Sequence, residues 1–340
     1  MTSSATLSMN ETVAERPRVR HKLRNIAEGT PVLQVLGVIV LVAYATITIP
    51  GFLGRSSLNS TLVLAAFLGI AATGQTLVIL LGGIDLSVPA VISGANLMTP
   101  MLVGKGMPFG AAFAVVILAA GAVGAINGYL VRRLRLSALV FTLASGAIVT
   151  GFTLAWSHSG TATGAIPAWL ANFSSPVGRT FGLTVPPVIV VWAAVAIGLG
   201  IVLHRTVTGR HVYATATNEL AASIAGIRTR RIWVGAFTVS ALSAACLGVL
   251  LDGFVGAPTL GVGAPYLFTS LTAVMVGGTS LVGGRGDYWR TVLGALIVTL
   301  ISTLLVSRGA GQGLQELLFG LLILLFVGLY GRDRRVRDRI

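Results

Sequence analysis

Residues 60–82 read STLVLAAFLGIAATGQTLVILLG and contain no charged side chain. About 20 apolar residues in succession are enough for a helix to cross the hydrocarbon core of a bilayer. Comparable stretches recur along the chain, and together they predict ten membrane-spanning helices in an all-α polytopic membrane protein. The predicted spans are 31–50, 60–82, 86–104, 108–131, 137–157, 184–204, 232–252, 267–282, 290–307 and 313–331. The exact ends of the third and eighth spans are not fixed by the sequence, because prolines interrupt the third and the eighth lies in a long uncharged stretch.

The composition of the whole chain agrees with these spans. Of its 340 residues, 54% are hydrophobic and only 10% are charged, and the mean hydropathy is +0.89. A soluble domain carries about 25% charged residues, so these values exclude an ordinary soluble enzyme, a disordered chain and a coiled coil. The single cysteine, Cys246, excludes an internal disulfide framework.

The basic residues are distributed unevenly between the two sides that ten spans would define. With the N-terminus in the cytoplasm, 20 of the 24 Lys and Arg residues lie on the cytoplasmic side. The four others are Arg55, Lys105, Arg179 and Arg308. Because Lys and Arg near span ends favour the cytoplasmic side, this distribution predicts that both termini are cytoplasmic. The net charge of +14 is therefore interpreted as a signal of topology and not as a nucleic-acid-binding surface.

No linker or change of composition divides the chain. We therefore expect a single transmembrane domain over 31–331, a cytoplasmic N-terminal tail over 1–30 and a cytoplasmic C-terminal tail over 332–340. A cleavable signal peptide is the alternative for the first span, because Ala43-Tyr44-Ala45 follows an apolar stretch. The long polar leader and the distribution of basic residues favour a retained span.

No arrangement of side chains in the sequence predicts catalysis, a cofactor or a metal site. The four histidines lack the spacing of metal ligands, and no nucleophile is paired with a base. A Gly-rich loop followed by Lys and Ser or Thr is missing, so we do not expect this chain to bind ATP. Ion-driven carriers usually place charged groups at mid-membrane, and no acidic residue lies in the middle of a predicted span. An ion-coupled secondary carrier of small polar solutes remains the alternative to a transport subunit that is driven by a partner.

The longest predicted cytoplasmic loop, 205–231, contains a predicted short helix. Thr217 or Asn218 can cap its N-terminus, Glu219 suits the positive end of the helix dipole, and Gly226 can end the helix. This capping pattern predicts a helix at the membrane surface.

The same short helix is amphipathic. Leu220, Ile224 and Ile227 fall on one face, which either lies on lipid headgroups or enters a groove on a soluble partner. The segment resembles the coupling segment of ABC importer permeases, whose hallmark is Glu-Ala-Ala, three residues and Gly. Here Leu220 occupies the position of that Glu, and Glu219 lies one place earlier. The residues assigned to ATPase coupling are Glu219, Leu220, Ala221, Ala222, Ile224 and Gly226.

Four longer blocks resemble the ribose/xylose/galactoside-type sugar permeases of ABC importers, in the order found in that family. They are GQTLVILLGGIDLSV at 74–88, AINGYLV at 125–131, GRHVYA at 209–214 and GGTSLVGGRG at 277–286. Four blocks in order argue against a scaffold protein without transport. The resemblance implies a permease subunit in the bacterial inner (plasma) membrane, with the fold of the vitamin B12 importer permease.

The family also implies several partners. These are an ABC ATPase subunit, a periplasmic or extracellular solute-binding protein, and a second permease copy or close paralogue in the same lipid bilayer. We expect the binding protein to dock over residues 158–183 and 253–266. The sequence does not specify which sugar or sugar-like solute is carried.

Polar side chains within or beside the apolar spans are candidates for helix caps or for the translocation pathway. They are Gln75, Asp85, Ser87, Asn96, Asn127, Thr142 and Ser280. We expect Asp85 to cap a helix, and we expect most polar groups inside spans to bond neighbouring helices rather than solute. The glycine pairs Gly82-Gly83 and Gly277-Gly278 are expected to end their spans, since glycine permits a positive φ.

Overall fold

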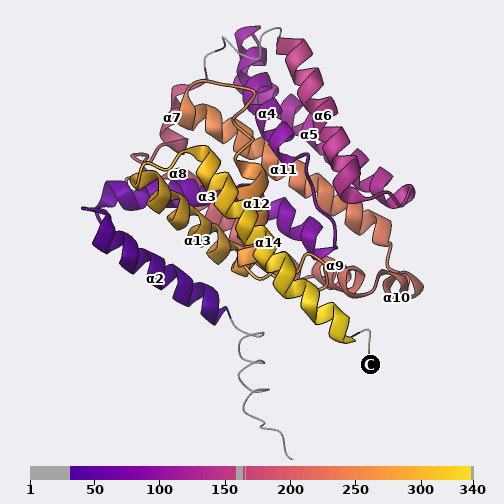
Figure 1. Cartoon of the computed structure of the whole chain (residues 1–340). Coiled ribbons are helices and arrows are strands. Elements are labelled where there is room, and N and C mark those ends of the chain that lie inside the picture. Colours follow the sequence, from indigo (N-terminus) through magenta and orange to yellow (C-terminus); the bar gives the residue numbers. More distant parts are fainter. Residues whose placement is uncertain (1–30, 158–163, 165, 338–340) are drawn as a thin grey trace, which may run out of the picture.

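The computed structural model describes residues 31–157, 164 and 166–337, and helices dominate these residues (Figure 1). The helices are α2 (Val32–Thr48), α3 (Arg55–Leu80), α4 (Val88–Gly104), α5 (Phe109–Arg133), α6 (Ala138–Ser157), α7 (Ala168–Ser174), α8 (Pro187–Arg205), α9 (Val207–Thr217), α10 (Glu219–Ile224), α11 (Thr229–Val255), α12 (Tyr266–Val276), α13 (Tyr288–Ser307) and α14 (Gln312–Arg337). The all-α class is confirmed.

Each of the ten predicted spans coincides with a helix. Six of these helices are long and apolar enough to cross a membrane, namely α3, α5, α6, α8, α11 and α13. The apolar parts of α2, α4, α12 and α14 are shorter, so the total of ten spans stays a prediction.

The predicted eighth span, 267–282, is wrong at its C-terminal end. Helix α12 stops at Val276, and Gly278 has a φ of +93°. Its 11 residues extend about 16 Å, roughly half the thickness of a hydrocarbon core. Non-helical backbone at membrane depth is tolerated where protein buries it, and most of residues 277–287 are partly or fully buried, whereas Val282 and Arg285 are exposed.

Two further differences concern the ends and the connections. Helices α7 and α9 were not predicted, and α14 continues to Arg337, through most of the segment expected to be a tail. The predicted N-terminal tail, 1–30, lies outside the described residues.

Helices α3 and α11 form the centre of the molecule. The most apolar window of α3 is 89% buried and that of α11 is 61% buried, against 22–28% for α5, α6 and α8. Small residues allow this close packing: a Cβ added to Gly128 of α5 would lie 2.7 Å from the Val234 Cα of α11. The outer helices therefore present apolar side chains to lipid, and α3 is surrounded by protein.

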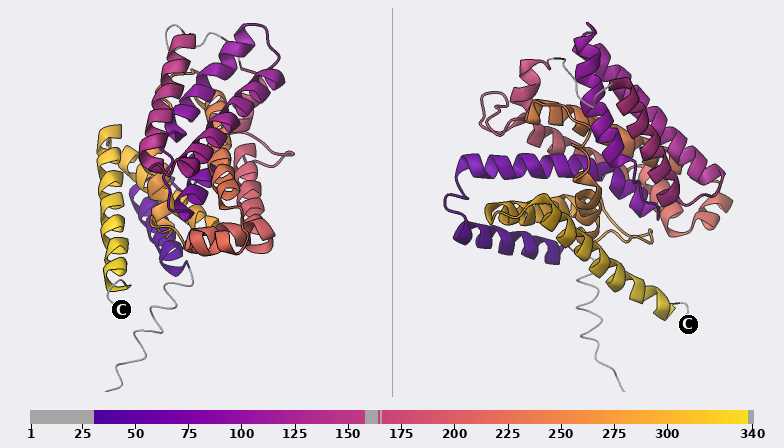
Figure 2. Two further views of the ribbon diagram at one scale, coloured as in Figure 1. Left: turned by 90° about the vertical axis from the view of Figure 1, so that its right-hand side faces the viewer. Right: turned by 45° about the horizontal axis from the view of Figure 1, so that its top comes forward.

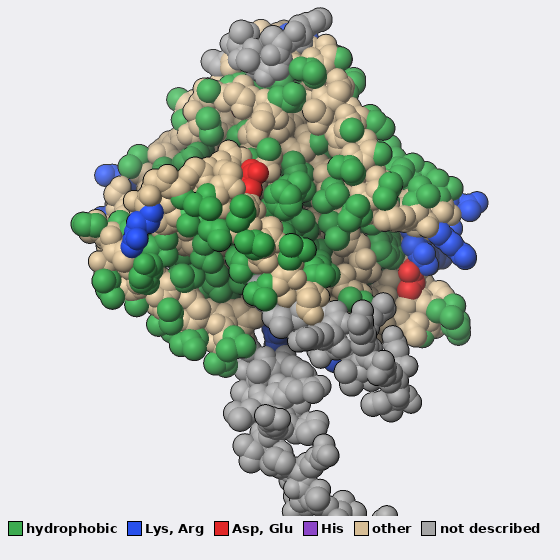
Figure 3. All heavy atoms as spheres, viewed as in Figure 1, with side chains coloured by type: hydrophobic (Ala, Val, Ile, Leu, Met, Phe, Trp, Pro, Cys, Tyr) green, Lys and Arg blue, Asp and Glu red, His purple; other side chains and the backbone are tan. Residues whose placement is uncertain are grey.

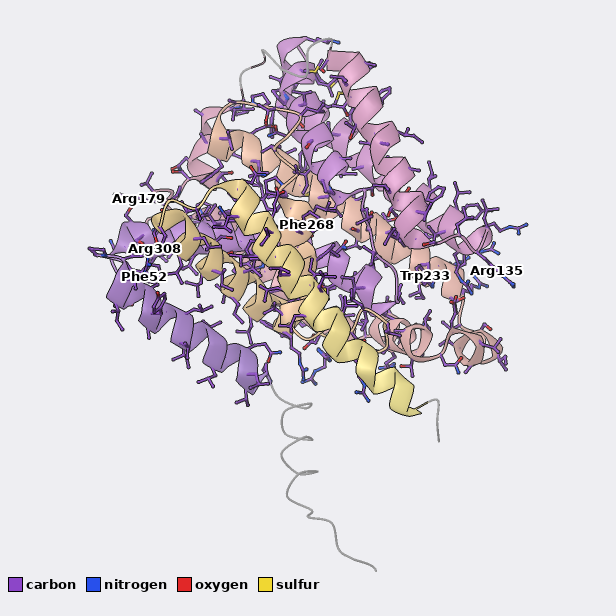
Figure 4. All side chains as sticks on the ribbon, viewed as in Figure 1. Phe52, Arg135, Arg179, Trp233, Phe268 and Arg308 are labelled. Carbon is purple, nitrogen blue, oxygen red and sulfur yellow. The ribbon has the colours of Figure 1, made fainter. Side chains whose placement is uncertain are left out.

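The molecule has two ends at which the connections gather (Figures 1 and 2). Helix α7 lies at one end, and α9 and α10 lie at the opposite end; we term these the α7 end and the α10 end. Figure 3 shows a largely apolar surface with Lys and Arg side chains concentrated at the two sides, mostly beside α10. Arg179 and Arg308 lie at the α7 end, whereas Arg135 lies at the α10 end (Figure 4).

Candidate functional site

Helix α10 forms at the predicted position and with the predicted caps. Asn218 is the N-cap, and its side-chain oxygen accepts a hydrogen bond of 3.0 Å from the Ala221 amide. At the C-terminus the Ile227 amide donates to the Ala222 carbonyl at 3.0 Å, and Gly226 has a φ of +82°. This is a Schellman motif, in which a left-handed residue closes the helix. Local capping therefore suffices to define a helix of only six residues.

Two contacts hold α10 against the rest of the molecule. Ala222 is buried, so the helix packs through this small side chain. Glu219 forms an ion pair with Arg132 in the last turn of α5. The sequence predicted that Glu219 lies at the positive end of the helix dipole, but it did not predict this ion pair between α10 and α5. The orientation of α10 is thereby fixed.

The outward side of α10 is apolar. Leu220 is 72% exposed and Ile224 is 79% exposed, while Ile227 is partly buried. Ala221 is also exposed. Exposed arginines lie on the segments that precede and follow this end of the molecule in the fold, namely Arg133, Arg135, Arg228, Arg230 and Arg231. Two exposed aliphatic anchors with arginines on adjacent segments suit a partner surface that has an apolar groove and acidic groups.

A buried polar cluster lies in the connection between α3 and α4. Asp85 Oδ1 accepts hydrogen bonds from the Ser87 amide at 3.0 Å and from Ser87 Oγ at 2.5 Å. Asn127 Nδ2 of α5 donates to Ser87 Oγ at 3.2 Å, and Thr142 Oγ1 of α6 accepts from the Leu86 amide at 2.9 Å. Asp85 thus stabilises the turn that leads into α4 and bonds to the N-cap residue Ser87, rather than capping the helix itself.

The charge state of Asp85 depends on this cluster. Burial raises the pKa of its carboxyl above the ordinary value, and the hydrogen bonds from Ser87 partly oppose this shift. Asp85 is almost fully buried. In this cluster, Asp85 Oδ1, Ser87, Asn127 and Thr142 all form hydrogen bonds with other protein groups.

Asn96 bonds to several parts of the α7 end. Its Nδ2 donates to Asp252 Oδ1 at 2.6 Å and to the Gly248 carbonyl at 3.2 Å, both on α11. Its Oδ1 accepts from the Thr259 amide at 3.0 Å. Asn96, Asn127 and Thr142 therefore all bond to protein groups, as expected for polar residues between helices. The sequence did not single out Asp252 as the partner of Asn96.

Gln75 differs from the other polar candidates. It is buried inside α3, and neither Nε2 nor Oε1 has a hydrogen-bond partner among the described residues. Burying an amide without hydrogen-bond partners costs free energy. We therefore expect a water molecule or a solute group to form hydrogen bonds with the Gln75 side chain. Ser280 lies partly buried in the segment after α12.

The predicted turn at Gly82-Gly83 packs against Gly283, in the segment that follows the other predicted turn, Gly277-Gly278. We term residues 277–287 the glycine loop. Gly82 and Gly283 have φ values of +83° and +82°, and a Cβ on Gly283 would lie 2.9 Å from both the Gly82 nitrogen and the Leu80 oxygen. Residues about 200 positions apart in the sequence therefore form one joint at the α10 end.

The sequence did not single out the side chains that attach this joint to α8 and α9. Tyr213 Oη donates to the Gly286 carbonyl at 2.9 Å, and His204 Nε2 lies 3.0 Å from Asp287 Oδ1. Burial, followed by the Asp287 carboxylate, raises the pKa of Tyr213 to about 12, so the hydroxyl keeps its proton. The feature of the sequence that could have identified Tyr213 is the block at 209–214, which contains it.

No group of three or more His, Cys, Asp or Glu side chains in the described part of the chain is arranged to hold a metal ion.

Comparisons with known proteins give the family. Residues 57–327 match the family described as the permease component of branched-chain amino acid transport systems. The chain is 34% identical over 323 residues to a fructose import permease protein of Rhizobium meliloti, covering 93% of this chain and 89% of that protein. It is 32% identical over 295 residues to a ribose import permease protein of Bacillus subtilis (strain 168), covering 86% and 90%.

A third relative is an autoinducer 2 import system permease protein of Enterobacter sp. (strain 638), 31% identical over 321 residues and covering 94% of this chain and 90% of the relative. No solved structure matches the chain, so the arrangement of the vitamin B12 importer permease stays a prediction. Because the family match covers most of the sequence, the chain belongs to this family of transport-system permease components and is a multi-pass membrane transport subunit.

Proposed function

We propose that the protein is the translocation subunit of an ATP-driven, binding-protein-dependent importer for a sugar or sugar-like solute. The names of three relatives, which refer to import of ribose, fructose and autoinducer 2, support this substrate class. The observation that carries the proposal is the exposed pair Leu220 and Ile224 on the capped helix α10.

The exposed pair favours a protein partner over a lipid surface. Burying one such side chain contributes roughly 1.5–3 kcal/mol, so two anchors add too little to hold a loop firmly on headgroups. A groove that encloses both anchors and carries acidic groups for the nearby arginines would contact the apolar and the basic side chains together. We assign this groove to a separate ATPase subunit, which hydrolyses ATP and moves α10.

The proposal fixes the orientation of the chain. The α10 end faces the cytoplasm, and both termini lie on that side of the bacterial inner membrane. This orientation follows from the 20 of 24 basic residues that a ten-span topology places there. The chain then forms one permease domain, which pairs with a second copy or a close paralogue in the vitamin B12 importer arrangement.

The opposite end would receive the solute-binding protein. The expected docking region, 158–183 and 253–266, lies at the α7 end, except for 158–163 and 165, which lie outside the described residues. It includes a tight turn in which Thr180 and Leu183 exchange backbone hydrogen bonds of 3.0 and 2.9 Å. Phe181 at its tip is fully exposed. A rigid aromatic side chain of this kind is a suitable anchor for a protein partner.

We propose Gln75 and Ser280 as the pathway residues among the polar candidates. The unpartnered amide of Gln75 could bond to water or to the hydroxyl groups of a passing sugar. Asp85, Ser87, Asn96, Asn127 and Thr142 are bonded to protein groups and are assigned to structure.

The test measures uptake of radiolabelled D-ribose and D-fructose. Cells express the chain with the ATPase and binding protein encoded beside it, and the reference strain lacks the chain alone. Ile224→Asp should weaken ATPase co-purification about 30-fold or more, since it removes about 2 kcal/mol of apolar burial and would place a charge in the groove. Uptake should be lost in parallel.

Thr208→Asp is the matched control, because it adds the same carboxylate to the same connection at an exposed site in the first turn of α9. A negative charge is favourable in that first turn, so this variant should keep both the ATPase and uptake. If Ile224→Asp retains the ATPase and transports like the parent, α10 is not the coupling element. Uptake unaffected by loss of the chain would remove the transport assignment.

A further inference from the structure

The glycine loop lies between two helix ends. On one side, the Gly284 amide donates a hydrogen bond of 3.0 Å to the Leu80 carbonyl at the end of α3. On the other side, a Cβ on Gly284 would lie 3.4 Å from the Ala216 oxygen and 3.7 Å from the Thr217 Cα, at the end of α9. The loop is therefore in contact with both the central helix and the segment that precedes α10.

Directional contacts of the glycine loop with the end of α8 and with α9 come from His204 and Tyr213, respectively. The Tyr213 hydroxyl donates to the Gly286 carbonyl at 2.9 Å, and the neighbouring His204 lies 3.0 Å from Asp287. The rings of His204 and Tyr213 are stacked, with centroids 6.2 Å apart and planes inclined by 30°. His204 is 45% exposed, so water screens its contact with Asp287. Tyr213 is more enclosed, and its hydroxyl forms the more directional attachment.

Helix α10 is joined closely to α9. Only Asn218 separates the two helices, and its side chain is committed to capping α10. From the other side of the glycine loop, the end of α3 leads through residues 81–87 to the buried cluster around Asp85. A continuous physical connection thus runs from the exposed face of α10 to the central helix.

We propose that Tyr213 is a positioning residue that couples movement of α10 to the glycine loop, and through the loop to the end of α3. This inference rests on the proposed function, because it requires an ATPase that moves α10. When the ATPase binds nucleotide, α9 shifts and Tyr213 draws the Gly286 carbonyl with it. Without the hydroxyl, α9 moves but the loop follows it weakly.

The test follows the loop directly, so it does not depend on knowing the solute. Cys246 is first replaced (Cys246→Ser), and Ser280→Cys then places a single thiol in the glycine loop. The full chain is purified with its ATPase in nanodiscs, and the rate of maleimide labelling is measured with and without AMP-PNP. We expect the nucleotide to change the labelling rate in this parent.

Tyr213→Phe keeps the ring and removes only the hydroxyl. We expect it to reduce the nucleotide-dependent ratio of labelling rates about fivefold, the factor equivalent to about 1 kcal/mol and to one hydrogen bond. Tyr129→Phe is the matched control, since Tyr129 is an exposed tyrosine at the same end whose ring is covered by Arg230. This control should retain the ratio of the parent.

The outcomes separate this inference from the proposed function. If the ATPase does not co-purify with the parent chain, the proposed function fails. If it does, and Tyr213→Phe shows the parent ratio, Tyr213 does not couple the two elements. A purely structural role would change the labelling rate by the same factor with and without AMP-PNP, and this result would also overturn the proposal. Thermal unfolding of each variant verifies that it is folded.

Discussion

The connections at the two ends of the molecule are held in different ways. At the α7 end, asparagines from the helices bond directly to loop backbone: Asn96 accepts from the Thr259 amide, and Asn59 donates to the carbonyls of Pro176 and Thr184 at 3.1 Å each. At the α10 end, the glycine loop is held by Tyr213 and by the half-exposed pair of His204 and Asp287.

This difference has a consequence for motion. Buried hydrogen bonds are costly to break because no water replaces the lost partner, whereas bonds at the surface exchange with water at little net cost. Segments with solvent-exposed bonds open at low free energy. We therefore expect the α7 end to remain rigid where the buried Asn96 holds it, and the α10 end to rearrange, which is the behaviour required of a surface that responds to an ATPase.

The largest expected effect is at Asn96. Asn96→Leu has similar volume but leaves the buried Asp252 carboxyl and the Thr259 amide without their partner. We expect it to lower the free energy of unfolding by about 3 kcal/mol or more, measured by equilibrium unfolding in mixed micelles. Asn59→Leu is the control, because that side chain is only partly buried and water can replace it. Equal effects of the two substitutions would contradict the assigned importance of burial.

A smaller loss is expected in the glycine loop. Gly283→Ala forces a Cβ onto a residue with a φ of +82° and places it 2.9 Å from the Gly82 nitrogen. Left-handed backbone alone costs roughly 1–2 kcal/mol for such a residue, so unfolding should become easier by about 2 kcal/mol. Gly235→Ala in α11, where the added Cβ meets open space, should be neutral or slightly stabilising. A neutral Gly283→Ala would show that Gly283 and the turn at Gly82-Gly83 are not in close contact.

The sequence predicted the features that local chemistry determines. Long apolar runs define α3 and α11, and Asn218 and Gly226 define α10 because caps act within a few residues. The bounds 267–282 followed the apolar run past the end of α12, whereas the glycine pair Gly277-Gly278, expected to end the span through a positive φ, marks that end correctly.

Long-range attachments were not predictable in the same way. Tyr213 and Gly286 are 73 residues apart, and the bond uses a backbone carbonyl that any residue at position 286 would supply. The exposure of Leu220 and Ile224 followed from the helix period, whereas the burial of Ala222 depends on how α10 packs against its neighbours. Helical periodicity identifies a face but not the surface that this face contacts.

A gain in stability is expected at the tip of the α7-end turn. Phe181 has a φ of +49° and precedes Gly182, with a φ of +84°, the pattern of a type I′ turn that favours Asn-Gly. Phe181→Asn should raise the unfolding free energy by about 1 kcal/mol through relief of strain and weaken binding of the solute-binding protein. Leu183→Asn, also exposed but without a positive φ, should bring no gain. If Phe181→Asn leaves that affinity unchanged, the tip is not a docking anchor.

The smallest effect should come from His204→Ala, which gives the sharpest contrast with Asn96. The contact between His204 and Asp287 is 3.0 Å, comparable to the bonds of Asn96, yet the His204 side chain is 45% exposed. Exposed pairs contribute about 0–1 kcal/mol, so the unfolding free energy should change by less than about 1 kcal/mol in the same mixed-micelle assay. Asn96→Leu should therefore exceed His204→Ala about threefold or more in free energy. If His204→Ala were as destabilising as Asn96→Leu, the glycine loop would be as firmly fixed as the α7 end, and the proposed rearrangement at the α10 end would lose its physical basis.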